Sequence, residues 1–282
     1  MGRLRFGPAG KPVGFKGPME RVPEYLSKMG LDALEYEAVR GVRISEEKAR
    51  LLGEEARKYD VKLSMHAPYY INLSSPDPSV VERSLARLRD ALVASEWMGA
   101  YAVVFHPGYI KGNKSRGEAV RRVIEALKKL EEELAGELRV AEPAPETTGK
   151  VSQVGDLDEV IEICRNLERC RPAVDWAHLY ARHEGGFVRS VDEVIAAIER
   201  IEKELGSRAV KPLHTHFSKI EYGRGGEREH HTLPEEEYGP DWRVVCRAYL
   251  ETGIDGVIIS ESPILDRDAL LMKRICEEER GA

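Results

Sequence analysis

The chain has 282 residues, which suits one large α/β barrel, because such barrels commonly contain about 250 residues. Hydrophobic residues make up 42% of the sequence and charged residues 33%, which excludes a disordered or membrane-embedded chain and is typical of an ordinary soluble globular protein. The formal net charge of −6 argues against a protein that binds nucleic acid through a generally basic surface, although bound metal ions would add local positive charge that this sum omits.

Short apolar runs alternate with amphipathic helical patterns along the whole chain. The strands are expected at Arg3–Phe6, Ala33–Tyr36, Lys62–Met65, Ala102–Phe105, Leu138–Ala141, Ala173–Val174, Val210–Thr215 and Gly256–Ser260. A helical pattern follows each strand, with capping side chains such as Ser45, Ser79 and Ser190 near helix starts. Eight such units predict a parallel sheet closed into a single (β/α)8 TIM barrel, an α/β fold that forms one domain over residues 1–282.

The cysteines and the N-terminal sequence predict where the protein acts. Cys164, Cys170, Cys246 and Cys276 fall in predicted helices and lack the CxxC spacing of zinc ribbons and redox motifs, so we expect them to be reduced. The N-terminal sequence MGRLRFGPAGKPVGF has no apolar run of signal-peptide length, and no stretch is apolar enough to span a bilayer. These features predict a cytoplasmic protein without a membrane partner.

All eight histidines fall at or just after the ends of predicted strands, where barrels of this class place their chemistry. They occur in SMHAPYYINL, VVFHPGY, VDWAHLYARH, LHTHFSK and EREHH, and the accompanying carboxylates are Glu146, Asp175, Glu227, Glu229 and Glu261. Imidazole and carboxylate without cysteine suit zinc, manganese or iron, and more than four potential ligands indicate more than one ion. The sequence therefore predicts a cluster of two or three metal ions at the C-terminal mouth of the barrel, of the kind that hydrolyses phosphodiesters.

Each motif alone also has a structural explanation. His66 before Ala-Pro-Tyr could cap a strand, and a glutamate after a strand could interact with a helix N-terminus. The pair Asp175 and His178 is more specific, since one loop would present two ligands. The argument for metal rests on the combination, because seven loops or strand ends on one predicted rim each carry an Asp, Glu or His.

The order and spacing of these motifs resemble the endonuclease IV family of abasic-site endonucleases over nearly the whole chain. The motifs that carry the resemblance are HAPYYINL, VVFHPG, ETTGK, DWAH, HFSK, GEREHHTL and a final strand that ends at Glu261. The resemblance implies a zinc-dependent deoxyribonuclease of DNA repair that cleaves double-stranded DNA 5′ of abasic sites and leaves a 3′-hydroxyl. It also implies three zinc ions, with manganese or iron as partial substitutes, and we expect a monomer.

The resemblance assigns the ligands in three groups. They are His66, His106 and Glu146 for the first zinc; Glu146, Asp175, His216 and Glu261 for the second; and His178, Glu227 and His230 for the third. Glu146 would bridge the first two ions and, with Glu261, have a catalytic role. Tyr69 matches a family position near the DNA, although packing beside a proline would also explain a tyrosine there.

Three ligand choices stay open from the sequence. His214 and His216 are two residues apart and would point to the same side of a strand, and His216 is preferred. Glu142 also lies near the fifth strand, but Glu146, followed by Thr-Thr-Gly, fits the family pattern better. The family pattern Asp-Arg-His-His-Ser-Leu aligns with Arg-Glu-His-His-Thr-Leu at 228–233, which puts Arg228 where an acidic ligand is expected. Glu227 with His230 is the preferred replacement, whereas Glu229 with His231 would keep the usual ligand spacing.

Two other functions remain possible from the sequence. A metal-dependent sugar isomerase or epimerase of the xylose-isomerase-like barrel class needs fewer metal ligands, and would leave His66, His106 and His230 to bind substrate. A noncatalytic protein that binds metal or damaged DNA would coordinate every ion fully, with no open position. The number of ligands around each ion separates these functions.

Overall fold

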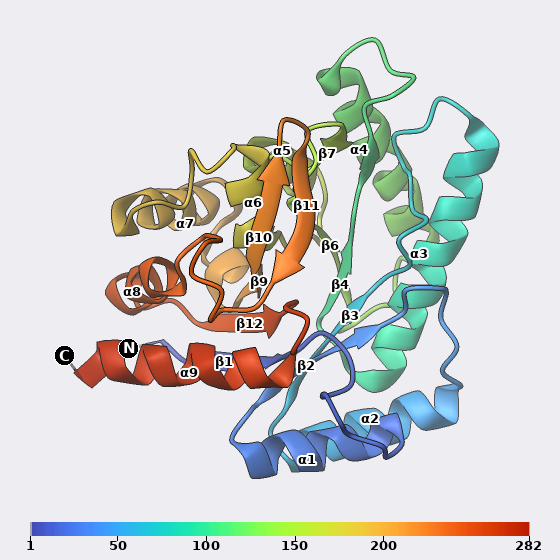
Figure 1. Cartoon of the computed structure of the whole chain (residues 1–282). Coiled ribbons are helices and arrows are strands. Elements are labelled where there is room, and N and C mark those ends of the chain that lie inside the picture. Colours follow the sequence, from blue (N-terminus) through green and yellow to red (C-terminus); the bar gives the residue numbers. More distant parts are fainter. Residues whose placement is uncertain (1, 282) are drawn as a thin grey trace.

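The structure is a computed structural model that describes residues 2–281, and eight parallel strands in it form a barrel surrounded by helices (Figure 1). The barrel strands are β1 (Leu4–Pro8), β2 (Ala33–Glu37), β3 (Lys62–His66), β4 (Ala102–Phe105), β6 (Glu142–Pro145), β8 (Ala173–Asp175), β9 (Leu213–Phe217) and β12 (Gly256–Ser260). The helices are α1 (Val22–Met29), α2 (Glu46–Lys58), α3 (Pro78–Met98), α4 (Arg116–Glu133), α5 (Leu157–Arg165), α6 (Trp176–Arg182), α7 (Val191–Leu205), α8 (Trp242–Thr252) and α9 (Asp266–Gly281), with 3-10 helices η1 (Met19–Arg21) and η2 (Ser207–Val210). The predicted TIM barrel is thus confirmed.

The barrel consists of two four-stranded runs that meet at two seams. Strands pair in parallel in the orders β1-β12-β9-β8 and β2-β3-β4-β6. At the β1–β2 seam Ala9 pairs with Glu35, and at the β6–β8 seam Glu146 pairs with Ala173. The N–H of Thr147 donates to the Ala173 carbonyl across the second seam at 3.0 Å. Each seam therefore has less backbone pairing than the strand pairs on either side of it.

The helices pack their apolar faces against the barrel, and several of their N-termini are capped by side chains. Ser45 caps α2 and Ser190 caps α7, as expected from the sequence. The expectation for Ser79 was wrong, because Asp77 is the cap of α3 and accepts the N–H of Ser79 at 2.9 Å. Proline at the first position of α3 fits this arrangement, because an N–H at that position would have no partner inside the helix and proline lacks one. Among the described residues, no helix combines the length and apolar character needed to cross a bilayer.

Two barrel strands begin later in the chain than the sequence pattern indicated. The fifth barrel strand, β6, follows the predicted range Leu138–Ala141 and contains Pro143 and Pro145. Prolines argue against a central strand because they cannot donate to a neighbour. Here the N–H groups of Glu142 and Glu146 donate to the carbonyls of Tyr101 and Phe105 on the β4 side. Backbone N–H groups alternate in direction along a strand, so the two prolines occupy positions whose N–H would point the other way, to the β6–β8 seam.

Strand β9 also begins later than the predicted range Val210–Thr215. Val210 ends the 3-10 helix η2, and Pro212 stands between that helix and the strand. The consequence concerns the histidine pair of this segment, because His214 and His216 lie inside the strand rather than after its end.

A hairpin that the sequence pattern did not reveal follows β9 (Figure 1). It consists of β10 (Lys219–Gly223) and β11 (Gly226–His231), which pair antiparallel with a shift of register between Glu221 and Tyr222. A second short pair, β5 (Gly108–Tyr109) and β7 (Gln153–Val154), joins two loops that follow barrel strands. Both pairs come from segments that lie beyond the carboxyl ends of the barrel strands.

The four cysteines form two disulfides, so the expectation of reduced cysteines was wrong. Cys164, on α5, pairs with Cys170 beyond the end of that helix, with 5.0 Å between their Cα atoms. Cys246 pairs with Cys276 and links α8 to α9, with 5.7 Å between the Cα atoms. A search for CxxC spacing could not find either pair, because their sequence separations are 6 and 30 residues.

Candidate metal centre

The imidazole and carboxylate side chains collect at the carboxyl ends of the barrel strands. His66 ends β3, His106 follows β4 directly, and Glu146 follows β6. Asp175 ends β8, and Glu261 follows β12. Because parallel strands of a barrel present these ends on one side, five strands bring the side chains to a common mouth, with further donors from β9, α6 and β11.

The first group of donors consists of His66, His106 and Glu146, whose donor atoms lie within 4.8 Å of one another. Glu146 Oε2 is 3.3 Å from His66 Nε2 and 2.9 Å from His106 Nε2. The Nδ1–H of His66 donates to the carbonyl of Ala67 at 2.8 Å. Histidine ligands of metals commonly donate their second ring N–H to a carbonyl in this way, which directs Nε2 of His66 toward the site.

The second group consists of Glu146, Asp175, His216 and Glu261. The other oxygen of Glu146, Oε1, lies 3.0 Å from His216 Nδ1, and Glu261 Oε1 lies 3.1 Å from the same nitrogen. The two oxygens of Glu146 therefore face different groups, which is the geometry of a carboxylate that bridges two ions.

Asp175 supplies a test of whether this arrangement fits a cation. One oxygen, Oδ1, accepts the N–H of His178 at 2.7 Å and caps α6. The other oxygen, Oδ2, is buried and has no hydrogen-bond partner among the described residues. A buried carboxylate oxygen without a partner costs free energy unless a cation or donor satisfies it, and a metal ion of the second group would do so.

The third group consists of His178, His230 and Glu261, with Glu227 beside it. The Nδ1–H of His178 donates to the Thr147 carbonyl at 2.9 Å, so Nε2 faces the site and lies 3.6 Å from Glu227 Oε2. The rings of His178 and His230 are 5.3 Å apart. Nitrogen and oxygen donors again meet without cysteine, as zinc, manganese and iron accept.

An irregularity in β11 explains why Glu227 and His230 share one side although they are three residues apart. Between the pairs Tyr222–Glu227 and Glu221–Glu229, β11 has one more residue than β10, and such a bulge shifts the alternation of side chains by one. Gly149 of the ETTGK motif gives Glu227 its space, since a Cβ at Gly149 would lie 2.5 Å from Glu227 Cβ.

The alternative pair, Glu229 and His231, does not face the mouth. Their donor atoms approach those of Glu221 on the hairpin, where Glu229 is exposed to solvent. His231 is hydrogen-bonded to Glu235 at 3.0 Å and stacks on Tyr238 with ring centroids 3.6 Å apart. The structure thus brings Glu227 and His230, rather than Glu229 and His231, to the other donors.

His214 and His216 do point to the same side of β9, but they lie at different depths of the barrel. Both ring nitrogens of His214 have protein partners: Tyr101 Oη lies 2.7 Å from Nδ1, and Glu35 lies 3.0 Å from Nε2. Burial lowers the pKa of His214, which keeps the ring neutral. His216 lies nearer the mouth and is the one whose Nδ1 faces Glu146 and Glu261.

Reasoning from the sequence missed Glu35 and Glu37 on β2. They are two residues apart in ALEYE, so both point to the same side of the strand, and a pair of glutamates inside a mostly buried strand was a usable signal. Glu35 contacts both histidines of β9. Burial raises the pKa of Glu37 to about 8, and one of its oxygens is buried without a hydrogen-bond partner.

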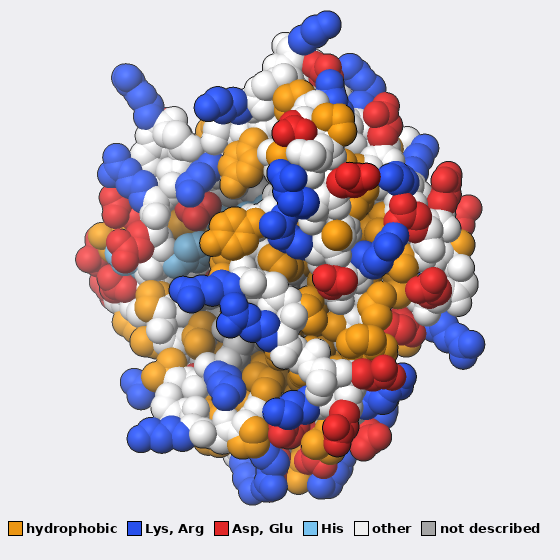
Figure 2. Space-filling model, turned by 90° about the vertical axis from the view of Figure 1, so that its right-hand side faces the viewer, with side chains coloured by type: hydrophobic (Ala, Val, Ile, Leu, Met, Phe, Trp, Pro, Cys, Tyr) orange, Lys and Arg blue, Asp and Glu red, His pale blue; other side chains and the backbone are white. Residues whose placement is uncertain are grey.

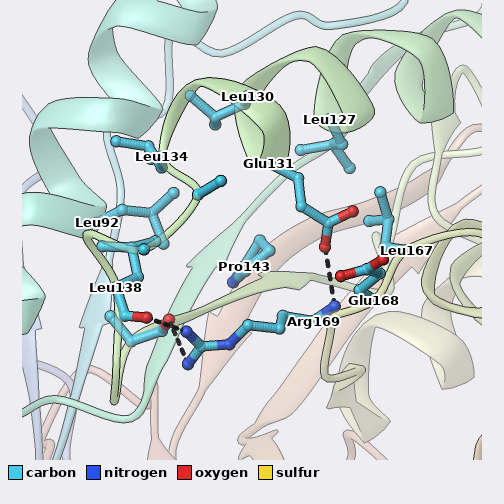
Figure 3. Close-up of a pocket in the computed structure, with 13 residues that line it drawn as sticks. Leu92, Leu127, Leu130, Glu131, Leu134, Leu138, Pro143, Leu167, Glu168 and Arg169 are labelled. Carbon is cyan, nitrogen blue, oxygen red and sulfur yellow. Dashed lines mark hydrogen bonds between the residues drawn. The ribbon is translucent and has the colours of Figure 1, made fainter.

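Glu142 lies at the opposite end of the barrel from the mouth. It begins β6 and contacts Arg171 at 3.3 Å, whereas Glu146 follows the last residue of that strand. The apolar cavity of about 230 Å³ in Figure 3 lies at the same end, between Leu138, Pro143 and leucines of α3 and α4. Arg169 borders this cavity and donates to the Leu138 carbonyl. Neither Glu142 nor the cavity is therefore part of the donor cluster.

Tyr69 lies at the edge of the donor cluster. Its ring centroid is 5.0 Å from that of His66 and 5.8 Å from that of His106, and 44% of the residue is exposed. Burial raises the pKa of Tyr69, so the hydroxyl keeps its proton.

One face of the molecule shows histidine side chains at its left side among hydrophobic and acidic groups, with basic and acidic residues interspersed elsewhere (Figure 2).

Comparison with known proteins finds relatives of similar sequence. The chain is 35% identical to an uncharacterized protein of Methanocaldococcus jannaschii, over 98% of this chain and 97% of the relative. It is 29% identical to a probable endonuclease 4 of Thermoplasma acidophilum, but that alignment covers 64% of this chain and only 61% of the relative. The resemblance to endonuclease IV that the motifs indicated is thus confirmed at the level of sequence similarity.

Solved structures share the fold. Endonuclease IV from Thermus thermophilus superposes with a TM-score of 0.72 at 22% identity, over 98% of this chain and 99% of that one. A D-tagatose 3-epimerase-like protein superposes with a TM-score of 0.67, also at 22% identity, over 93% and 95%. A family model described as xylose isomerase-like TIM barrel matches residues 23–275. The chain therefore belongs to the xylose isomerase-like TIM barrel family.

Proposed function

We propose that the protein is a metal-dependent phosphodiesterase of DNA repair, which hydrolyses double-stranded DNA 5′ of abasic sites and leaves a 3′-hydroxyl. The observation that carries the proposal is the position of Glu146, whose two oxygens face two different groups of donors beside a third group. Three groups of donors, each holding an ion, would suit phosphodiester hydrolysis, in which charge develops on several oxygens at once. Similarity to endonuclease 4 proteins supports the same activity.

The proposed ions are zinc, with manganese or iron as partial substitutes. The ligands are those of the three groups, namely His66, His106, Glu146, Asp175, His178, His216, Glu227, His230 and Glu261. When bound, such ions would lower the pKa of a water molecule and offset the negative charge of the phosphate. Glu146 would fix the spacing of the first two ions, and Glu261 would hold the second, so we assign both a catalytic role.

The remaining side chains would bind and orient the DNA. Tyr69 stands at the rim, partly exposed and next to two of the proposed ligands, where its ring could stack against a distorted duplex. An abasic nucleotide has no base to unstack, so rotating it into the mouth costs less free energy than rotating a normal nucleotide. That difference would supply selectivity for the lesion.

The second candidate is a metal-dependent sugar epimerase or isomerase. It is favoured by the shared fold with a D-tagatose 3-epimerase-like protein, and the second group alone offers enough donors for one ion. Against it, His66 and His106 both direct Nε2 at Glu146, which a sugar-binding role would not require.

The deciding experiment is cleavage of a labelled duplex that carries one tetrahydrofuran abasic analogue, by protein of measured metal content. We expect incision 5′ of the analogue, loss of incision after chelation, and recovery when zinc is added back. Glu146→Gln should lower the rate more than about 100-fold, because loss of a direct ligand exceeds the effect of losing an outer hydrogen bond. Glu142→Gln is the matched control, since this glutamate is also buried but lies at the other end of the barrel.

No incision by protein that carries nearly three ions would contradict the nuclease, and sugar epimerisation would then be assayed. Incision that survives complete chelation would contradict the metal-dependent mechanism.

A further inference from the structure

A layer of buried polar side chains lies directly beneath the proposed metal centre. It is formed by Glu35 on β2 and by His214 and His216 on β9, and none of the three is exposed to solvent. Glu35 Oε1 lies 2.9 Å from His216 Nε2, and Glu35 Oε2 lies 3.0 Å from His214 Nε2. One carboxylate therefore faces both histidines of β9.

The contacts of this layer determine where its protons lie. Nε2 of the neutral His214 lies 3.0 Å from the carboxylate of Glu35 and carries the ring proton, so Nδ1 has the lone pair and accepts the hydroxyl of Tyr101. Ser64 Oγ donates to the same oxygen of Glu35 at 2.7 Å. Because both nitrogens of His214 are engaged, we do not assign the three residues as a further metal site, although their donor atoms are close enough for one.

The other oxygen of Glu35, Oε1, contacts His216. Glu35 Oε1 and His216 Nε2 are both buried and form a close ion-pair contact, and neither has a hydrogen-bond partner among the described residues. At 2.9 Å from a carboxylate oxygen, a protonated ring nitrogen is favoured over an unprotonated one, because two lone pairs would repel each other. Nδ1 of His216 also faces carboxylates, Glu146 Oε1 at 3.0 Å and Glu261 Oε1 at 3.1 Å, so without an ion it too carries a proton, which an ion binding at Nδ1 would displace.

Two other histidines of the centre are also held through the ring nitrogen that faces away from the site. His66 and His178 each donate their Nδ1–H to a backbone carbonyl, which turns Nε2 toward the site. The ring of His216 has the opposite orientation, with Nδ1 toward the site and Nε2 away from it. Its partner is a charged side chain, and not a carbonyl of the local backbone, so the orientation of His216 depends on one residue of another strand.

We propose that Glu35 is a positioning residue of the metal centre, which holds His216 with its proton on Nε2 and its Nδ1 toward the second ion. Ser64 and His214 fix the carboxylate of Glu35 through Oε2, and this leaves Oε1 in place for His216. The inference rests on the proposed metal centre and adds a residue outside its set of ligands. Partners of this kind typically change metal affinity about 10- to 100-fold when they are removed.

Glu35→Gln tests the proposal with little change of shape. The amide keeps one acceptor oxygen and gains an NH₂ donor, whereas Ser64, His214 and His216 all donate to Glu35. We expect affinity for one zinc ion to fall about 10- to 100-fold in competition with a chromophoric chelator. The cobalt-loaded variant should also show a changed visible absorption spectrum, because the geometry at His216 changes. Loss of stability alone would alter neither measurement in the folded variant.

Two variants serve as controls. Ser64→Ala removes only the hydrogen bond to the other oxygen of Glu35, so its effect on zinc affinity should be smaller than that of Glu35→Gln. Glu142→Gln removes a charge that is also buried but contacts Arg171 at the opposite end of the barrel, and it should leave zinc affinity and the cobalt spectrum unchanged. Thermal melts of all variants verify that each is folded.

The outcomes separate this inference from the proposed function. Wild-type protein that retains no ion from buffered zinc would overturn the metal centre itself. Wild-type protein that binds three ions, beside Glu35→Gln with unchanged affinity and cobalt spectrum, would overturn only the role of Glu35. Four ions in wild type and three in the variant would show that Glu35 is a ligand, and this also contradicts the proposal.

Discussion

The buried histidines and carboxylates of the mouth share protons when no ion lies between them. Burial alone would lower the pKa of His66. The hydrogen bond to Glu146 and the charges of nearby carboxylates outweigh burial and raise this pKa to about 10. Burial raises the pKa of Asp175 to about 6. For Glu261 burial acts in the same direction, but His216 outweighs it and lowers the pKa to about 2. A metal ion that enters the cluster must therefore displace protons from histidines.

This leads to a prediction for the stability of the metal-free protein. The contribution of His66 is fully present below its ordinary pKa of 6.5 and is lost as pH rises through about 10. That of Glu261 is present above 4.5 and lost as pH falls toward about 2. The melting temperature of metal-free protein should therefore fall between about pH 6.5 and 8.5, because the pKa values of His178 and His216 are raised like that of His66, and the pKa of Glu37, about 8, acts in the same direction.

Zinc-loaded protein should behave differently over this range, because fewer protons oppose binding at higher pH. The gap between the melting temperatures of loaded and metal-free protein is expected to widen as pH rises. Calorimetry of both forms at several pH values measures it. A gap that stays constant would argue against ions at the histidines.

The sequence predicted the residues of the mouth better than the residues that support them. His66, His106 and Glu146 belong to short motifs directly after strands, so their placement follows from the fold alone. Glu35 belongs to no motif, and its importance depends on which residues of β9 face it across the barrel. The choice between His214 and His216 likewise depends on depth inside the barrel, which spacing along a strand does not reveal.

At the level of elements, the hairpin β10–β11 decides which acidic residue joins the third group. Its bulge directs Glu227 and His230 to the mouth and leaves Glu229 on the other side. Glu227→Gln should therefore lower the metal content by roughly one ion per chain, because three protein ligands are typical of such a site. Glu229→Gln, a matched change two residues away, should leave it unchanged.

Metal analysis by mass spectrometry after gel filtration checks this pair of variants. The assignment would be wrong if Glu229→Gln lost an ion and Glu227→Gln kept all of them. The hairpin itself was hidden in the sequence, since EYGRGGEREHH is almost entirely polar and shows no strand alternation.

Strand β6 shows another limit of reading elements from the sequence. The pattern of eight units and the order of the strands followed from alternation alone, but EPAP does not look like a barrel strand. Its prolines are tolerated because they face the β6–β8 seam, where few ladder hydrogen bonds form. Where the seam lies is a property of the closed barrel and cannot be deduced from the strand itself.

At the scale of the whole molecule, the proposed ions span one seam of the barrel. His66 and His106 belong to the run β2-β3-β4-β6, whereas Asp175, His216 and Glu261 belong to or follow strands of the other run. Glu146, at the β6–β8 seam, is shared by the first and second groups. Bound ions would thus connect the two runs at one of the two seams, where backbone pairing is sparse.

Removing the metal should therefore loosen this seam selectively. The amide of Thr147 donates across it to Ala173, and we expect its hydrogen exchange to accelerate on the order of 10- to 100-fold in metal-free protein, as linkage to ligand binding predicts. The amide of Asp32 donates to the carbonyl of Phe6 at 3.0 Å across the β1–β2 seam, away from the mouth, and is the internal control. Equal acceleration at both amides would indicate general loosening instead.

The position of the donors along the chain also sets the order in which the centre can assemble during synthesis. The first group is complete once Glu146 has been added to the chain, with almost half of the chain still to be made. The second and third groups both include Glu261, which follows β12. A nascent chain therefore possesses a full set of donors for one ion long before the barrel can close, whereas truncation before β12 would spare that set and disable the other two.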